Sequence, residues 1–274
     1  MVNKCIFNED TFYFRKEVFM TKDQVIYLFC SFFVVSLTLF LAHYIKKQKY
    51  KNLFLFIVAS LCFAMHISTI YTTFFANGGC GLAADNQLFP IYFCNYMMDL
   101  LVLVSLWPNK ESKFFKNMAT FVAYGGCFGA IITVFFTDPG FKEWSNFQSA
   151  LSHSFLLMGC LFLFVGGYVK INVYNLVPYT FGLLSCGVVG GIVELIFYLG
   201  GLPSPNAMYL VHGPHELPAF KWWMFALSML SLIFIFTSLW EHFTKKKEER
   251  WFKSIKDLFI YIPERKESSK NIEE

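Results

Sequence analysis

Long apolar runs account for most of this chain, and they constrain its fold more than any other feature. A membrane-spanning helix needs roughly 20 predominantly apolar residues, and about seven runs approach that length. Backbone groups cannot stay unpaired in hydrocarbon, so such runs must be helical. The pattern predicts an all-α, polytopic transmembrane helix bundle of about seven spans, or six if the first helix is short. The expected spans cover residues 25–45, 53–75, 88–107, 114–137, 146–169, 175–199 and 221–241.

Composition leaves no room for a separate soluble domain. Only 15% of the 274 residues are charged and 56% are hydrophobic, whereas a soluble domain carries roughly a quarter charged residues. The net charge of +4 does not indicate a nucleic-acid partner, because loop orientation and anionic headgroups explain the lysines. The eight cysteines form no C-x-x-C pair, so neither a metal nor another cofactor is expected.

Lysines alternate between successive loops. They occur after the first, third and fifth spans and in the C-terminal tail, while the fourth loop has only Lys142. The positive-inside rule then predicts a multi-pass protein of the cell membrane, with the N-terminus outside and the C-terminus inside. The N-terminal segment, residues 1–24, departs from this rule, because it carries four basic residues on the expected outer side. The bundle is expected to occupy residues 25–241, followed by a basic cytoplasmic tail at 242–274.

The tail is expected to form an amphipathic interfacial helix on anionic inner-leaflet lipid. Its apolar residues recur at helical spacing beside lysines. The alternative is a docking segment for a partner protein. The apolar residues are Trp251, Phe252, Ile255, Leu258 and Phe259.

Few polar residues interrupt the apolar runs, and most of those fall towards one membrane face. Ionisable groups in hydrocarbon are costly and normally mark function. At a rise of about 1.5 Å per residue, Cys94, His153 and Glu194 lie roughly 8–10 Å from the outer side. His66 and Asp99 come out near the midplane, about 14–16 Å deep. These positions predict a polar pocket that opens to the outer side.

Cys94 and His153 come out level on two helices of the same direction. A thiolate is the reactive form of cysteine, and a neighbouring imidazole lowers the pKa of the thiol or takes its proton. Asp99 or Glu194 can orient the imidazole through its other nitrogen. Asn95 or Asn206 can stabilise an oxyanion. The arrangement predicts a Cys–His pair that forms an acyl-thioester.

Other interpretations stay open. A lone intramembrane cysteine is commonly a small apolar filler, and a lone histidine commonly has a structural hydrogen bond. The same pocket can hold a small solute or a proton, with Asp99 and Glu194 as the working carboxylates. A third interpretation is a scaffold subunit that uses the basic tail.

The connection after the sixth span lies on the same outer side and is expected to cover the pocket. It is long and contains three prolines, two histidines and a tyrosine. Its His212, His215 and Glu216 are too loosely spaced to predict a metal site.

Three short stretches resemble the signature motifs of the YwaF-like membrane proteins, which are similar to the eukaryotic transmembrane protein 164. The family pattern has Leu-Pro-Leu-His/Gln-Leu-Cys entering a helix, a Ser-His or similar pair two helices on, and Asn-Tyr-Met-Tyr-Leu in a late loop. The resemblance spans about residues 50–240, with spacing intact. The matching stretches are Phe89-Pro90-Ile91-Tyr92-Phe93-Cys94, Ser152-His153 and Asn206-Ala207-Met208-Tyr209-Leu210.

The resemblance implies a bundle of seven or six helices, related in fold to the membrane threonine hydrolases that cleave fatty-acid esters. It also implies a phospholipid acyltransferase with a cysteine nucleophile, as reported for the eukaryotic relative. Position by position, Cys94 is then the nucleophile and His153 its base, while Asn206 and Tyr209 line the site. Tyr92 departs from the family, which often has His or Gln there, and the alanine at 207 replaces a tyrosine.

Taken together, the residues and the resemblance predict an intramembrane lipid acyltransferase or acyl hydrolase that acts on outer-leaflet lipid. Membrane lipid is the expected partner and nucleic acid is not. The substrate, the acyl donor and the oligomeric state stay open. The residues expected to bind the substrate beside Cys94 and His153 are Tyr92, Asn95, Asp99, Glu194, Asn206, Tyr209 and His66.

Overall fold

The computed structural model describes residues 21–71, 89–136, 141, 144–202, 204–211 and 221–252. These residues form helices and no strand. Six helices are long and apolar enough to cross a membrane, and a seventh, α4, is shorter. The predicted polytopic helical bundle is therefore confirmed. The helices are α1 (Lys22–Tyr44), α2 (Gln48–Tyr71), α4 (Phe93–Leu106), α5 (Lys113–Phe136), α6 (Trp144–Val165), α7 (Leu176–Leu199) and α8 (Trp222–Thr244), with short 3₁₀ turns η2 (Val173–Asn175), η3 (Ala207–Tyr209) and η4 (Lys247–Glu249).

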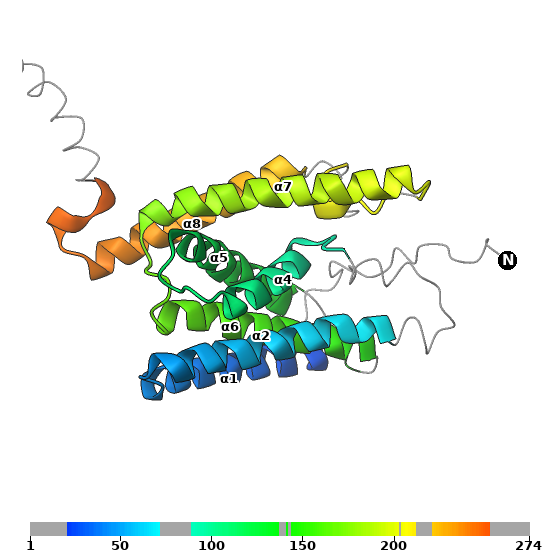
Figure 1. The fold of residues 1–274 in the computed structure, drawn as a ribbon. Coiled ribbons are helices and arrows are strands. Elements are labelled where there is room, and N and C mark those ends of the chain that lie inside the picture. Colours follow the sequence, from blue (N-terminus) through cyan, green and yellow to red (C-terminus); the bar gives the residue numbers. More distant parts are fainter. Residues whose placement is uncertain are drawn as a thin grey trace, which may run out of the picture.

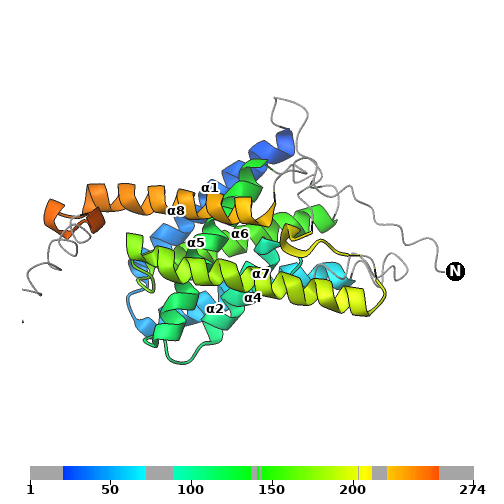
Figure 2. The ribbon, with the colours of Figure 1, turned by 90° about the horizontal axis from the view of Figure 1, so that it is seen from above.

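The helices lie in three groups. Helices α1, α2 and α6 form one side of the bundle, α7 and α8 form the other, and α4 and α5 lie between them (Figure 1). Helix α6 packs against α1, α2 and α5, while α4 packs against α2 and α5. Seen from above, α7 and α8 lie over α5 (Figure 2). The short α4 thus lies between longer neighbours.

One end of the bundle collects most of the loop lysines and is called here the lysine-rich end. Lys51 Nζ donates to the carbonyl oxygen of Gly166, just beyond the C-terminus of α6, at 2.7 Å. Lys110 Nζ donates to the last carbonyl groups of α4, those of Val104 and Ser105, at 2.6 and 2.8 Å. Burial lowers the pKa of Lys110 to about 8, and the two carbonyl acceptors favour its ammonium form. Both lysines satisfy orphan carbonyls and complement the negative end of a helix dipole.

Helix α4 begins at Phe93, five residues later than the expected 88–107 span. Phe89 precedes a proline, and the residue before a proline is disfavoured in the helical conformation. The Ile91 N–H instead donates to the Phe89 carbonyl at 2.8 Å, which closes a tight turn. The helix starts with an extended Tyr92 as its N-cap.

The C-terminus of α4 has a similar cause. Trp107 precedes Pro108 and takes an extended conformation, with φ −60° and ψ 122°. The resulting helix of 14 residues is about 21 Å long, shorter than a hydrocarbon core of roughly 30 Å. If its lysine-rich end reaches one membrane surface, its N-terminus lies inside the membrane.

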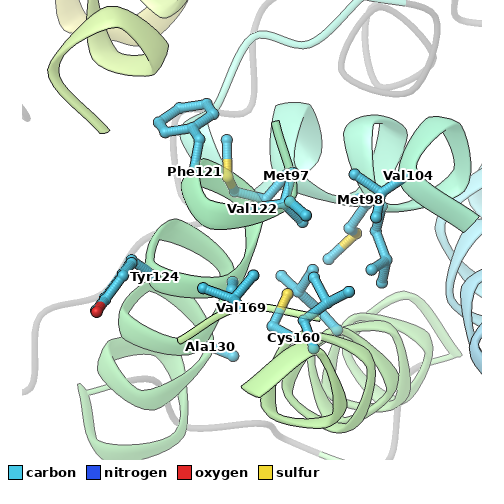
Figure 3. Close-up of a cluster of buried hydrophobic side chains, with 14 of the residues drawn as sticks. Met97, Met98, Val104, Phe121, Val122, Tyr124, Ala130, Cys160 and Val169 are labelled. Carbon is cyan, nitrogen blue, oxygen red and sulfur yellow. The ribbon is translucent and has the colours of Figure 1, made fainter. Parts of the chain in front are cut away.

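The core of the bundle is apolar and joins α4, α5 and α6. Met97 and Met98 of α4, Val122 of α5 and Cys160 of α6 are buried and lie close together (Figure 3). Helix α7 approaches α5 closely at Gly182, where a Cβ would lie 2.1 Å from the ring of Phe121. Small residues of α7 therefore serve packing within the bundle.

The described part of the tail folds back on α8. The ring of Trp251 packs on Phe234, with centroids 5.3 Å apart, and Arg250 Nη2 donates to the carbonyl of His242 at 2.7 Å. Most of the segment predicted to be an amphipathic helix lies after Phe252, outside the described residues, so the helix and its membrane contact stay a prediction.

Candidate functional site

Cys94 is the second residue of α4 and is partly exposed. Its thiol donates to Oδ1 of the buried Asn95 at 3.5 Å. In the first turn of a helix the backbone N–H groups are unpaired and the dipole is positive. Both effects favour a thiolate, whereas the burial of the thiol opposes it. This position distinguishes Cys94 from the described cysteines in helix interiors.

Two side chains join α2 to α6 beside the candidate histidines. The buried thiol of Cys62 donates to the Ser152 carbonyl at 3.3 Å. The buried amide of Gln148 donates to the His66 carbonyl at 3.2 Å and also to the carbonyl of Met65. Because buried polar groups without partners are costly, these bonds fix the register of the two helices.

The imidazole of His153 is held in one tautomer. The side chain is 7% exposed, and its Nδ1 lies 2.8 Å from the carbonyl oxygen of Ser149. A carbonyl only accepts, so Nδ1 carries the proton of the neutral ring. Nε2 then has the free lone pair, which is the state that a general base needs.

Cys94 and His153 lie equally far along their own helices. Each is about 18 Å from the lysine-rich end of its helix, counted along the helix rise. No hydrogen bond joins the Cys94 thiol to the His153 ring in the described part of the chain. Helix α2 lies against both of their helices. On α2, Cys62 lies close enough to Cys94 for the two side chains to interact electrostatically. The same holds for His66 and His153.

Asp99 adds a carboxylate to this region. It is partly buried, lies about 8 Å closer to the lysine-rich end than Cys94, and is within electrostatic range of Cys62 and Tyr96. Among the residues that the structure describes, no hydrogen bond or ion pair reaches its carboxyl oxygens. An ionisable group in this setting inside a transmembrane bundle indicates a functional role. We call this region the thiol–imidazole cluster, which comprises Cys62, His66, Cys94, Asn95, Asp99, Gln148, Ser152 and His153.

The other candidate residues lie at the end of the bundle away from the lysine-rich end, between α7, the loop at 204–211 and the entry to α4. Oε1 of Glu194 accepts from the Ala207 N–H at 2.5 Å, and Oε2 accepts from the Ser204 hydroxyl at 2.6 Å. The rings of Tyr92 and Tyr209 lie 6.0 Å apart. We call Glu194, Ser204 and Ala207 the glutamate clamp.

The loop that this clamp holds has an unusual backbone. Asn206, Met208 and Tyr209 have φ values of 52°, 53° and 56°, in the left-handed region that non-glycine residues rarely adopt. Each such residue costs of order 1–3 kcal/mol and persists only where its surroundings determine it. The Met208 N–H donates to the Ile91 carbonyl at 2.7 Å, so the strained turn is bonded to the segment that leads into α4.

A cavity of about 420 Å³ lies beside the glutamate clamp. Its lining residues are Glu194, Leu195, Tyr198, Leu202 and Ser204, and neither Cys94 nor His153 is among them. The candidate residues are therefore distributed over two clusters.

Metal ligation has no candidate in the described part of the chain. There, no three His, Cys, Asp or Glu side chains converge as a metal ion would require. The trio His212, His215 and Glu216 lies outside the described residues, as does Lys142.

Gln148 and Cys62 belong to the cluster although neither was predicted from the sequence. A signal for each was present. Gln148 is a polar amide inside an apolar run, five residues before His153, and Cys62 precedes His66 by one helical turn. The sequence does not show which groups accept their hydrogen bonds, because the acceptors are backbone carbonyl groups of a neighbouring helix.

The fold and these buried polar groups define a polytopic helical membrane protein with ionisable side chains inside its bundle. The family model of the TMEM164 family matches residues 19–240, and the chain belongs to this family. No curated protein and no solved structure matches the chain.

Proposed function

We propose that this protein is an intramembrane lipid acyltransferase or acyl hydrolase, with Cys94 as nucleophile and His153 as base. The observation that carries the proposal is the position of Cys94 in the first turn of α4. There the thiol is partly exposed, and the neighbouring helix α6 carries an imidazole whose Nε2 is an acceptor, equally far from the lysine-rich end of its own helix. Activated cysteines typically combine a helix N-terminus with a nearby imidazole.

The first step transfers an acyl group to the enzyme. His153 Nε2 takes the thiol proton while Cys94 Sγ attacks the ester carbonyl carbon of a phospholipid, so a C–S bond forms. The side-chain amide of Asn95 and the backbone N–H groups of Phe93 and Cys94, at the N-terminus of α4, are the donors that we assign to the oxyanion. The C–O ester bond then breaks, and the leaving alkoxide takes the proton from the imidazolium.

The second step releases the acyl group. The hydroxyl of a lysolipid, or water, attacks the thioester and loses its proton to His153. The C–S bond breaks, and the thiolate recovers the proton. A lysolipid acceptor gives acyl transfer, whereas water gives hydrolysis.

The thiol and the imidazole are not hydrogen-bonded to each other in the free protein. Catalytic hydrogen bonds are often long in free enzymes and tighten when the substrate binds. The bonds from Cys62 and Gln148 keep α6 in register with α2, so the closing movement is assigned to α4. Helix α4 is short, and its entry segment is bonded to the loop at 204–211.

The test is to trap the acyl-enzyme. The full chain in lipid nanodiscs is incubated with a phospholipid whose ester-linked chain carries an alkyne, then quenched in acid. Peptide mass spectrometry should find a hydroxylamine-sensitive adduct on Cys94. Cys94→Ala should abolish the adduct, and His153→Gln should lower its rate of formation by about a hundredfold.

Cys127→Ala is the matched control. Cys127 is also partly exposed and lies about 21 Å from the lysine-rich end of α5. This variant should form the adduct at the wild-type rate. A Cys94→Ala protein that turns over lipid as well as wild type would reject the proposal.

A solute or proton binder is the alternative, and the carboxylate of Asp99 favours it. This function predicts that Asp99→Asn abolishes uptake or proton coupling in proteoliposomes while Cys94→Ala has no effect. If the protein is the proposed enzyme, Cys94→Ala instead abolishes its reaction with lipid.

A further inference from the structure

We infer that Glu194 is a positioning residue, which acts on Cys94 through the loop at 204–211 and the segment before α4. The inference rests on the proposed function, because it concerns how that function's nucleophile is placed. From the sequence, Glu194 was expected to bind the substrate or to orient the imidazole of His153. The hydrogen bonds of its two carboxyl oxygens lead to this different role.

The first link is between Glu194 and η3. One oxygen accepts from the Ala207 N–H and the other from the Ser204 hydroxyl, and Ser204 Oγ in turn accepts from the Asn206 N–H at 3.1 Å. The side chain of Ala207 is fully buried against Ile91 and Val193. The carboxylate therefore satisfies a buried N–H that would otherwise be left unpaired.

The second link is between η3 and the entry to α4. The Met208 N–H donates to the Ile91 carbonyl, and the ring of Tyr209 lies against that of Tyr92. The carbonyl of Tyr92 accepts the first helical hydrogen bond of α4, from the Tyr96 N–H at 3.2 Å. A shift of η3 is thus transmitted to the turn that contains Cys94.

Backbone strain explains why the loop needs a clamp. Three left-handed residues in a run of four relax to ordinary conformations unless hydrogen bonds and packing hold them. The clamp supplies hydrogen bonds on one side, and α7 supplies packing on the other. Gly190 of α7 permits that packing, because a Cβ there would lie 2.8 Å from Leu210 Cδ1 and 3.0 Å from Met208 Cγ.

The role requires hydrogen-bond acceptors rather than a charge. In the described part of the chain, no lysine, arginine or histidine pairs with Glu194. A glutamine at this position can accept from the Ala207 N–H through its oxygen and donate to Ser204 Oγ through its nitrogen. Glu194→Gln should therefore be tolerated. If Glu194 instead carried a proton during the reaction, the same substitution would abolish its function, because an amide does not titrate.

The experiment measures two reactions at Cys94 in nanodiscs. One is the capture of the alkyne acyl chain. The other is the alkylation rate with N-ethylmaleimide, resolved by peptide, with Cys127 as the internal reference. Glu194→Leu should lower acyl capture at least tenfold and slow Cys94 alkylation at least fivefold, because the thiol leaves its helix-terminal position. Glu194→Gln should stay within about threefold of wild type in both reactions.

Two neighbouring glycines give a matched pair on α7. Gly190→Val should reproduce the Glu194→Leu defect by displacing Met208 and Leu210. Gly191→Val should have no effect, since a Cβ there meets nothing within 4 Å. If Glu194→Leu does not fold, the comparison of Gly190→Val with Gly191→Val still tests whether the 204–211 loop positions Cys94.

The outcomes separate this inference from the proposed function. Alkylation needs no acyl substrate, so it tests positioning even if the wild-type protein forms no acyl-enzyme. Wild-type alkylation and capture in both Glu194→Leu and Gly190→Val would overturn the inference. So would a Glu194→Gln defect as large as that of Glu194→Leu.

Discussion

Two glutamates at opposite ends of the bundle use their carboxylates in the same way. Glu241, near the lysine-rich end, accepts from the backbone N–H groups of Val173 at 2.9 Å and Trp251 at 3.0 Å. Glu194, near the other end, accepts from a backbone N–H and a hydroxyl of the 204–211 loop. Each residue joins a long helix to a short 3₁₀ turn.

The difference lies in what accompanies the carboxylate. Glu241 is 1% exposed and forms an ion pair with Lys245 at 2.8 Å, and the segments it joins have ordinary backbone geometry. Glu194 has no cation partner among the described residues and holds three left-handed residues beside the entry to α4. One type of hydrogen-bond clamp thus stabilises the fold at one end and maintains local strain at the other. Strain of this kind gathers at functional sites.

Removing the buried carboxylate of Glu241 should have the largest effect on stability. Glu241→Leu leaves two backbone N–H groups and Lys245 without their partner, at about 1–3 kcal/mol for each N–H. The Tm in nanodiscs should fall by about 5–10 °C, measured by differential scanning fluorimetry. Cys94 alkylation per folded molecule should not change. A selective loss of Cys94 reactivity would show that the two ends are not independent.

Substitution of each glutamate by glutamine should change the Tm less than Glu241→Leu does, and by different amounts at the two positions. Glutamine has a single acceptor oxygen, which cannot serve both N–H groups and the ammonium of Lys245, so Glu241→Gln should lower the Tm by about 3–6 °C. Glu194→Gln keeps both of its hydrogen bonds, and its Tm should stay within about 1 °C of wild type. Equal shifts for the two variants would contradict the distinction between an ion-paired and an unpaired clamp.

Backbone strain at Asn206 should give the smallest effect. A β-branched residue is poorly compatible with a φ of 52°, so Asn206→Val should lower the Tm by about 2–4 °C. Asn206→Gly accepts this conformation, and like the valine variant it loses the acceptor of the Val211 N–H, so its Tm should fall by less than that of the valine variant. The same fluorimetric measurement checks both. A valine variant as stable as the glycine variant would mean that the loop is not strained.

Much of the fold was predictable because hydropathy sums over a whole helix. A span of about 20 apolar residues tolerates several local misjudgements, and the expected helices match those observed to within a few residues at most ends. The C-terminus of α4 was also predictable, since a helix usually ends at or before the residue that precedes a proline, here Trp107. The start of α4 was not, because Pro90 is compatible with the first turn of a helix as well as with the turn that precedes one.

The candidate site was predictable only in part. Matching depths selected Cys94 and His153, which lie on neighbouring helices and are not hydrogen-bonded to each other. Depth also grouped Glu194 with them, but its carboxyl oxygens belong to the glutamate clamp. A position along a helix axis says nothing about which partner a side chain meets around that axis.

By itself, the sequence determined that the chain folds into membrane-spanning helices, which end carries the lysines, and which polar residues lie inside the spans. These properties follow from transfer free energies and chain length, which do not depend on neighbours. Only the tertiary structure decided that Cys62 bonds to Ser152, that Glu194 holds a left-handed turn, and that this turn is bonded to the segment before Cys94. The Cys62–Ser152 and Met208–Ile91 bonds join groups that are distant in sequence, so helix packing sets which groups meet. The bonds of Glu194 span only the loop after α7, and the strained conformation of that loop sets them.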